Sequence, residues 1–236
     1  MNTIKTALTL IPLCLTSITF SAQASTWSGE AELGAVVTSG NTETQTVNAK
    51  GKLVNEREKW KHTGFVWALN AADDVRTTAE RYGVIAKSDY KISEFDYVFI
   101  NISYEDDRFS GYEYQATESL GYGRRVIHQP NVSLDLEGGP GARQGEIKDG
   151  DSENEAILRL AGDLVWKISD SAEFGQALLM EIGEDITITR STTALKAQIV
   201  GSLAMKVSFM AKNTSDVPVG TEKTDTETAL TLVYNF

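Results

Sequence analysis

The sequence predicts an all-β protein: a transmembrane, antiparallel, up-and-down β-barrel of about 12 strands that follows a cleaved signal peptide. After the signal peptide, apolar and polar residues alternate with a period of two, which is typical of β-strands. The last alternating segment, Thr224 to Phe236, ends on an aromatic residue with no polar tail after it. No apolar run approaches the roughly 18 residues that a spanning helix requires. A chain of this kind can cross a membrane only as a closed sheet.

The first 24 residues are typical of a secretory signal peptide. Lys5 supplies the positive charge, Ala7 to Phe20 form a short apolar run, and Ala22-Gln23-Ala24 has the small-x-small form that a signal peptidase accepts. An uncleaved anchor is the alternative, which the short run disfavours. We therefore expect two parts, a signal peptide at 1–24 and a barrel at 25–236.

Composition excludes several classes of site. Cys14, the only cysteine, lies in the signal peptide, so the mature chain is expected to have no disulfide, thiolate metal site or cysteine nucleophile. The net charge is -11, and loss of Lys5 makes it about -12 (-11 minus 1). An acidic chain of this kind argues against nucleic acid as a partner.

The first half of the barrel is predicted from six alternating segments. The first runs from Trp27 to about Thr38 and the second from about Thr44 to Val54. The third begins at Trp60. The predicted lipid-facing rows that follow are Phe65, Trp67 and Leu69 in the third strand; Tyr82, Val84, Ala86, Tyr90 and Ile92 in the fourth; Val98, Ile100, Ile102 and Tyr104 in the fifth; and Tyr112, Tyr114, Ala116, Leu120 and Tyr122 in the sixth. Glu118 falls on the last row, so either a bulge changes the register or the face assignment is wrong there.

The second half continues the alternation and brings the count to about twelve, an even number as single-chain outer-membrane barrels require. Its predicted lipid-facing rows are Val132, Leu134 and Leu136; Ala156, Leu158, Leu160, Gly162, Leu164, Trp166 and Ile168; Phe174, Leu178, Met180 and Ile182; Thr193, Leu195, Ala197 and Ile199; Met205, Val207, Phe209 and Ala211; and Thr226, Thr228, Leu230, Leu232, Tyr234 and Phe236. The last strand is expected to close the barrel against the first.

Connection lengths predict an orientation, because such barrels have short periplasmic turns and longer outer loops. With a periplasmic amino terminus, the periplasmic turns are Asn55 to Lys59, Ser93 to Phe95, His128 to Asn131, Ser169 to Ala172 and Gly201-Ser202. The expected outer loops are Ser39 to Thr42, Ala71 to Ala79, Glu105 to Gly111, Ala142 to Ser152, Gly183 to Arg190 and Asn213 to Lys223. All but the first of these are longer than the turns.

Several blocks resemble the domain of unknown function 481 family, whose members are described as salt-induced outer-membrane proteins. They are Trp27 to Glu30 with Thr38 to Thr42, Tyr104 to Tyr112, Gly121 to Arg125, and Lys223 to Thr226 with Val233 to Phe236. The resemblance spans nearly the whole mature chain. It implies an outer-membrane barrel of Gram-negative bacteria linked to salt or osmotic conditions, and it implies no catalytic residue.

The predicted inward rows mix both signs of charge. The lumen-lining candidates are Glu30, Glu32, Lys50, Lys87, Asp89, Asp135, Arg159, Asp163, Lys167, Asp225 and Glu227. A barrel of about twelve strands is narrower than the 16- to 18-stranded porins, so opposite charges can pair across it. Two interpretations remain: a narrow path for small polar or cationic solutes, and an ion-paired interior that only maintains the shape.

The expected outer loops are acidic. Asp149, Asp151 and Glu153 have the alternate spacing of calcium ligands but lack the later Gly and Glu of a complete loop, so they are weak candidates for a divalent cation. The simpler interpretation is a solvated acidic rim, including Glu105 to Asp107, that contacts lipopolysaccharide. No cofactor is expected.

A barrel hydrolase would need a histidine beside a serine or a carboxylate. The two histidines, His62 and His128, fall at the periplasmic end with no outer-rim carboxylate in reach. We therefore expect no enzyme and no catalytic residue. A secreted soluble β-protein is a further alternative.

The predicted function is that of an integral outer-membrane barrel, with a narrow channel as the first hypothesis. The alternative is a closed structural barrel whose acidic loops bind lipopolysaccharide or a partner without conductance. Tyr234 and Phe236 are the expected signal to the barrel-assembly machinery.

Overall fold

A computed structural model describes residues 25–39, 44–72, 77–107, 112–147, 152–217 and 221–236. The predicted signal peptide at 1–24 lies outside the described residues. Within the described part there is no helix long and apolar enough to cross a membrane.

Twelve strands form one closed antiparallel barrel, which confirms the predicted fold class. They are β1 (Thr26–Ser39), β2 (Thr44–Glu56), β3 (Trp60–Ala72), β4 (Thr77–Lys91), β5 (Asp96–Asp107), β6 (Tyr112–His128), β7 (Val132–Ile147), β8 (Ser152–Ser169), β9 (Ala172–Gly183), β10 (Thr187–Val200), β11 (Leu203–Thr214) and β12 (Thr224–Asn235). Each strand pairs with its sequence neighbours, and β12 closes against β1 as expected.

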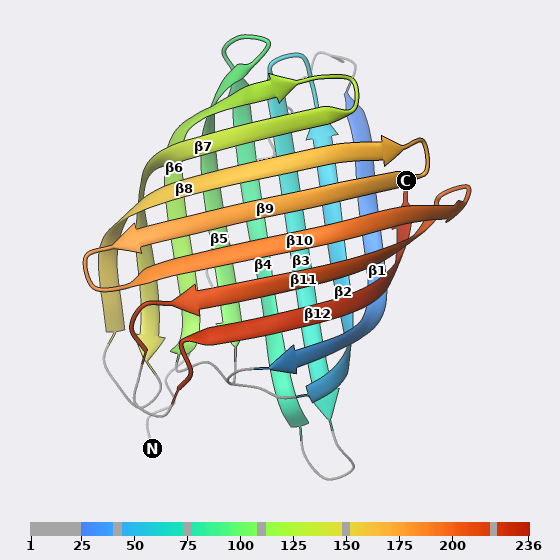
Figure 1. Ribbon diagram of the computed structural model, residues 1–236. Coiled ribbons are helices and arrows are strands. Elements are labelled where there is room, and N and C mark those ends of the chain that lie inside the picture. The colour runs from blue at the N-terminus through green and yellow to red at the C-terminus, as the bar shows by residue number, and fades with distance from the viewer. Residues whose placement is uncertain (1–24, 40–43, 73–76, 108–111, 148–151, 218–220) are drawn as a thin grey trace, which may run out of the picture.

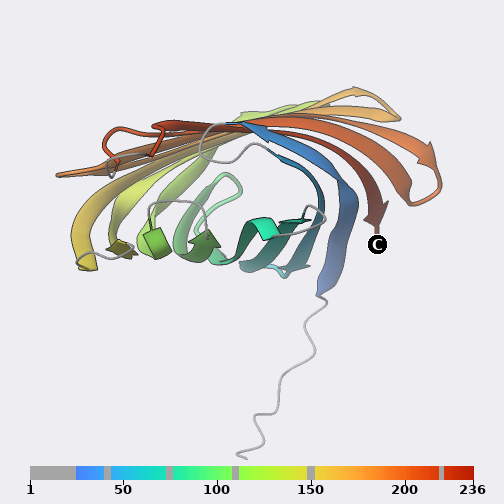
Figure 2. The same cartoon turned by 90° about the horizontal axis from the view of Figure 1, so that it is seen from below.

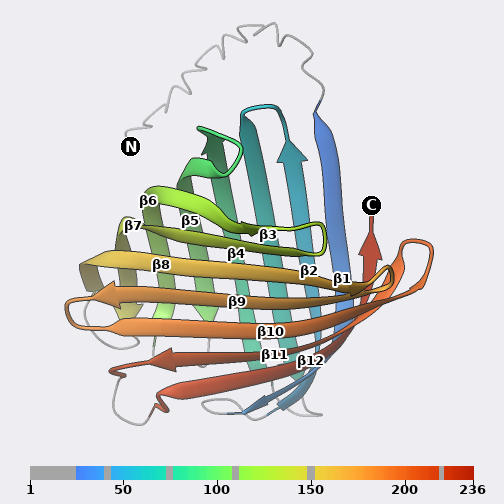
Figure 3. The ribbon, with the colours of Figure 1, turned by 45° about the horizontal axis from the view of Figure 1, so that its top comes forward.

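The barrel has two walls whose strands cross at a steep angle. β1 to β5 run along one wall and β8 to β12 run across the other (Figures 1 and 3). Strands must tilt to close a barrel, so the strands of opposite walls cross. Seen from below, the walls face each other across a flattened interior (Figure 2). Side chains from opposite walls can therefore meet.

The connections separate the two ends. The end with connections 57–59, 92–95, 129–131, 170–171 and 201–202 is called the short-turn end, and the opposite end is called the loop end. Most loop-end connections are shorter than the sequence predicted, because the strands extend further: β7 continues to Ile147 and β8 begins at Ser152. Polar side chains do not interrupt an antiparallel ladder, so the loss of apolar residues did not mark the strand ends.

The alternation places apolar side chains outside in most strands, as predicted. Large apolar residues that stay exposed include Leu33, Val84, Ile100, Leu158 and Leu232. The exterior is the expected surface for lipid, whereas most charged residues of the strands face inward.

The predicted outer row of β3 is wrong. Phe65 and Trp67 lie opposite Lys52 and Lys50 of β2 in the ladder, on the inward side, and Leu69 is 6% exposed. His62, Gly64, Val66 and Ala68 form the outward row instead. Aromatic residues suit both lipid and a packed interior, so their type did not fix the phase of the strand.

The predicted outer row of β6 is wrong at its first member. A register shift between Tyr112 and Tyr114 turns Tyr112 inward, where it packs with Ile186 and Ile188 at the loop end. Glu118 does face outward, opposite Ile102 of β5. The bulge therefore accounts for Tyr112 but leaves Glu118 on the apolar exterior.

Candidate functional site: a lumen crossed by ion pairs

Charged side chains project into the barrel from nearly every strand. The inward rows contain Glu30, Glu32, Lys50, Lys87, Asp89, Asp135, Arg159, Asp163, Lys167, Asp225 and Glu227. They do not converge on one centre. The ladder distributes them into separate groups, each of which joins different parts of the wall.

The group at the middle of the lumen is centred on Glu137 of β7. Its carboxylate accepts hydrogen bonds from Arg159 Nη1 at 2.9 Å, from the Tyr97 hydroxyl at 2.8 Å and from Lys87. Phe99, which is 2% exposed, packs its ring face against both cations. Arg159 Cζ lies 5.1 Å and Lys87 Nζ lies 5.4 Å from the ring centroid. Pairing and cation–π contact compensate the desolvation of these charges.

A second group joins β1 to the wall formed by β9, β10 and β11. Lys196 Nζ lies 2.8 Å from Glu30 and 3.2 Å from Glu173, and Lys206 pairs with Glu32. Lys196 and Glu30 are 166 positions apart in the sequence, and Lys206 and Glu32 are 174 apart. They hold the first strand against this wall.

The Glu227 cluster consists of Glu227, Lys50 and Arg81. Glu227 of β12 accepts a hydrogen bond from Lys50 Nζ at 2.9 Å and another from Arg81 of β4. Arg81 Nε is buried and has no hydrogen-bond partner within the described part of the chain. One carboxylate therefore serves two cations.

The Glu105 bridge spans the lumen. Glu105 of β5 lies 2.8 Å from Lys212 Nζ of β11 and 3.1 Å from Arg190 Nη2 of β10. Its strand is on the wall opposite β10 and β11, so the bridge crosses the interior. Again one carboxylate is shared by two cations, and their opposite charges hold the two walls together.

Two cavities open at the short-turn end. One of about 830 Å³ is lined by residues that include Lys61, Asp135 and Asp163. The other, of about 710 Å³, is lined by residues that include Lys167 and Lys196. Both have room for hydrated solutes.

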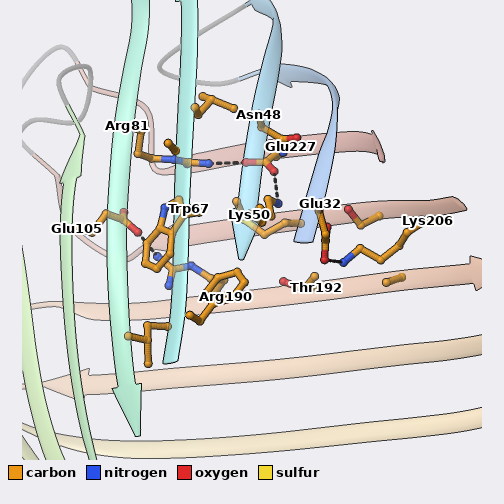
Figure 4. Close-up of a pocket in the computed structure, with 17 residues that line it drawn as sticks. Glu32, Asn48, Lys50, Trp67, Arg81, Glu105, Arg190, Thr192, Lys206 and Glu227 are labelled. Carbon is orange, nitrogen blue, oxygen red and sulfur yellow. Dashed lines mark hydrogen bonds and ion pairs between the residues drawn. The ribbon is translucent and has the colours of Figure 1, made fainter. Parts of the chain in front are cut away.

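The aromatic cavity, about 240 Å³, lies in the loop half beside the Glu105 bridge and the Glu227 cluster. Phe65, Trp67 and Leu69 contribute its apolar side, and Lys50, Arg81, Arg190 and Lys206 contribute cations (Figure 4). Phe65 and Trp67 stack with ring centroids 5.5 Å apart. A further pocket of about 70 Å³ lies on the other side of Glu105 and Arg190. The bridge therefore separates two cavities.

Asp89 lies 2.9 Å from Lys87 Nζ and so belongs with the Glu137 group, and the other four predicted residues remain outside these groups. Asp135 accepts two hydrogen bonds from Arg125, at 2.7 and 2.9 Å. Asp163 lies opposite Asp135 in the β7–β8 ladder, and both line the 830 Å³ cavity. Lys167 lies opposite Glu173 in the ladder, and Asp225 lies opposite Lys212.

Most of the predicted cation site lies outside the part of the protein that the structure describes. Asp149 and Asp151 lie outside the described residues, and Glu153 accepts a hydrogen bond from the Tyr112 hydroxyl at 3.2 Å. Among the described side chains, no group of three or more His, Cys, Asp or Glu is arranged to hold a metal ion.

The histidines lie near the short-turn end. His62 Nδ1 is 2.9 Å from Ser88 Oγ on the outer face, and its ring stacks on Trp60. His128 packs edge-on against Phe95. Within the described residues no carboxylate or amide hydrogen-bonds to His62, so the pair lacks the third group that would orient a catalytic base.

Sequence reasoning missed the residues that cross the loop half. Glu105 and Arg190 were assigned to outer loops, but Glu105 belongs to β5 and points inward. The alternation Val98, Ile100, Ile102 and Tyr104 continues to the end of that strand and would have placed Glu105 in the opposite row. Their meeting could not be read from the sequence, because it depends on how far the barrel is flattened.

Comparisons with known proteins identify a family and a relative. A family model described as "Protein of unknown function, DUF481" matches residues 31–236. "Uncharacterized protein YdiY" of Escherichia coli (strain K12) is 28% identical over 213 residues, which cover 88% of this chain and 82% of that protein.

Similar solved structures are also barrels. The NanC porin has a TM-score of 0.59 and 9% identity over 86% of this chain and 98% of its own. The KdgM porin in complex with disordered oligogalacturonate has a TM-score of 0.51 and 12% identity, covering 88% and 99%. The translocator domain of the autotransporter NalP from Neisseria meningitidis has a TM-score of 0.53 and 10% identity, covering 92% and 90%. At these identities the likeness concerns the fold.

Proposed function

The chain belongs to the family of proteins of unknown function DUF481, and from this premise we propose that it is an integral outer-membrane protein whose lumen is a narrow channel for small polar solutes. The protein would reside in a Gram-negative envelope after export by its signal peptide. As the family resemblance implies, its role would be linked to salt or osmotic conditions.

The exterior supports insertion in a membrane. Aromatic residues gather outside at the short-turn end, where Trp27, Trp60, Tyr122, Trp166 and Tyr234 are exposed. At the loop end Tyr82 is exposed and Tyr104 stacks on Tyr114. Two such girdles on either side of an apolar band are typical of outer-membrane barrels. We place the short-turn end in the periplasm.

The observation that carries the channel proposal is the interior. Two charged cavities of about 830 and 710 Å³ open at the short-turn end, and the aromatic cavity follows toward the loop end. A barrel packed only for stability has no need of such polar space. The Glu105 bridge is then the narrowest part of the path, where size and charge select.

The charge of the lumen differs between its halves. The 830 Å³ cavity contains more carboxylates than cations, which supports entry of the cationic solutes expected from the sequence. The aromatic cavity contains four cations and three carboxylates, which supports passage of anions. Selectivity would be decided at the narrow loop half. Two similar structures are porins, one of them in complex with oligogalacturonate, and they make a channel a reasonable class.

Planar-bilayer recording of the refolded mature protein tests the proposal. We expect small, discrete conductance steps. Glu105→Gln should increase the step size and shift selectivity toward anions, because Arg190 and Lys212 would lose their shared carboxylate. Glu184→Gln, at an exposed connection, is the matched control and should change neither. Absence of steps from protein that migrates as a folded barrel would contradict the channel.

A closed structural barrel is the second candidate, and the lumen-crossing ion pairs favour it. In that case the loop end would bind lipopolysaccharide or a partner without conductance. The same recording separates the two functions. Under either one, Tyr234 and Phe236 at the closing strand would engage the barrel-assembly machinery, for which their exposed, stacked rings provide the surface. We propose no enzymatic activity.

A further inference from the structure

The aromatic cavity has an apolar platform on one side. Phe65 and Trp67 of β3 present stacked rings to the interior. The Trp67 indole lies over Gly83 of β4, where an added Cβ would come within 2.2 Å of the ring. The glycine therefore fixes the indole against the wall and leaves its other side to the cavity. Such a surface suits the face of a flat or cyclic molecule.

The residues that line this cavity include more cations than carboxylates. Glu227 is shared between Lys50 and Arg81, and the Glu105 bridge divides one carboxylate between Arg190 and Lys212. The lining contains four cations, Lys50, Arg81, Arg190 and Lys206, and three carboxylates, Glu32, Glu105 and Glu227. In a confined space of low dielectric, a surplus of positive charge attracts an anion more strongly than it would in bulk water.

Polar groups with no partner point to the same anion. Asn48 of β2 is 2% exposed, and neither its amide nitrogen nor its amide oxygen has a hydrogen-bond partner in the described part of the barrel. Arg81 Nε is buried and lacks an acceptor as well. Both residues line the aromatic cavity, on either side of Leu69 in neighbouring strands. Buried donors without acceptors are uncommon, and a ligand oxygen would supply the missing hydrogen-bond acceptor.

We propose that the aromatic cavity is a binding site for a small carboxylate that carries a ring. The ring would lie on Phe65 and Trp67, and the carboxylate would accept hydrogen bonds from Asn48 and Arg81. The 240 Å³ volume limits the ligand to about one ring. This inference rests on the proposed channel, for which it names the solute class. A sugar acid and an aromatic acid share this chemistry.

Titration calorimetry of the full mature barrel in detergent tests the site, with glucuronate, benzoate, glucose and acetate as probes. We expect at least one ring carboxylate to bind tenfold or more tightly than both acetate and glucose. The tighter of glucuronate and benzoate identifies the source of the ring. If neither ring carboxylate binds saturably, or if acetate binds equally well, the proposal is wrong.

Variants locate the bound ligand. Asn48→Leu should weaken binding tenfold or more, whereas Asn101→Leu should not, since Asn101 lines the neighbouring 70 Å³ pocket. Ligand binding should change the tryptophan fluorescence of the native barrel, and Trp67→Phe should abolish that change, because the other three tryptophans lie outside. Unchanged binding in a folded Asn48→Leu barrel would overturn the site. If the barrel conducts but binds no ring carboxylate, only the proposed binding site is wrong. If it binds a ring carboxylate but does not conduct, only the proposed channel is wrong.

Discussion

At the scale of single residues, Gly83 positions the ring that defines the lumen. The Trp67 indole occupies the space that any side chain at position 83 would need, 2.2 Å from the expected Cβ. The requirement is steric and involves no unusual backbone conformation. Trp67 in turn forms part of both loop-half cavities. A change at a residue with no side chain would thus alter both.

Gly83→Ala is expected to displace the indole and lower the free energy of unfolding by about 1–3 kcal/mol, the usual cost of overpacking. Gly64→Ala is the matched control, because a Cβ at Gly64 on the outer face of β3 meets nothing within 4 Å. Urea unfolding followed by tryptophan fluorescence measures both variants. Equal stability of the two variants would show that the ring is not held in this way.

Glu118 is the opposite case, a charged residue where the exterior is apolar. It lies in the outward row of β6 midway between Tyr114 and Tyr122, with Ile102 opposite on β5. It has no hydrogen bond or ion pair with any other described residue. If the two tyrosines mark the two interfaces, Glu118 lies near the centre of the bilayer, where an ionisable group is costly.

Glu118→Leu is therefore expected to stabilise the barrel in lipid by roughly 1–2 kcal/mol, less than the roughly 2–4 kcal/mol known for Lys or Arg at the midplane. The measurement is reversible unfolding in lipid vesicles. Glu113→Leu, nearer the loop end of the same strand, provides the comparison. A loss of stability in Glu118→Leu would indicate that the carboxylate has a partner in the membrane.

At the scale of elements, β3 and β12 show how the same alternation can be informative or ambiguous. β12 alternates apolar residues with Asp225, Glu227, Thr231 and Asn235, so only one phase is possible. In β3, aromatic and aliphatic residues occur on both sides, and its phase is fixed by pairing with Lys50 and Lys52 of β2. A one-residue change of phase reverses every side chain.

The β1–β12 seam closes through the terminal residue. Phe236 donates a backbone hydrogen bond to Gly29 O at 3.0 Å and accepts one from Gly29 N at 2.8 Å. The Phe236 ring lies over Gly29, where a Cβ would come within 2.4 Å of it. The last residue thus completes the ladder as well as presenting a ring outside.

Deletion of Phe236 is expected to remove both hydrogen bonds, to cost about 1–3 kcal/mol at about 0.5–1.5 kcal/mol each, and to reduce the amount of assembled barrel. Phe236→Leu keeps the backbone pair and removes only the ring. Heat-modifiable migration of the membrane fraction measures assembly. If both variants assemble poorly, the aromatic ring of Phe236 is what assembly requires. If the deletion variant assembles normally, neither the ring nor the two backbone hydrogen bonds are needed.

At the scale of the whole molecule, we expect export to precede folding. The predicted signal peptide implies that the 25.8 kDa precursor is cut before Ser25. Ala24→Leu should leave the precursor uncut, because the peptidase requires a small residue there. Intact mass and amino-terminal sequencing of the outer-membrane fraction test this. Ala31→Leu, beyond the cleavage site, should be processed normally. Normal cleavage of Ala24→Leu would show that the cleavage site does not lie before Ser25.

The sequence by itself determined the fold class, the closing strand and most of the two faces. A period of two needs only local chemistry, since lipid selects apolar residues on one side and water selects charged ones on the other. It also placed Glu227 and Lys50 inward, from the residues of their own strands. The sequence misassigned the faces of Phe65, Trp67, Leu69 and Tyr112, because rings suit either environment and a bulge leaves no local mark.

Only the tertiary structure decided which charges meet. The Glu105 bridge joins residues 85 and 107 positions apart, and Arg81 reaches Glu227 across 146. These contacts follow from strand tilt and from the flattening of the barrel, which bring opposite walls together. Alternation specifies the side of the sheet on which a residue lies, but not the residue that faces it across the lumen. The candidate site is made of such pairs, so it emerged only when the barrel closed.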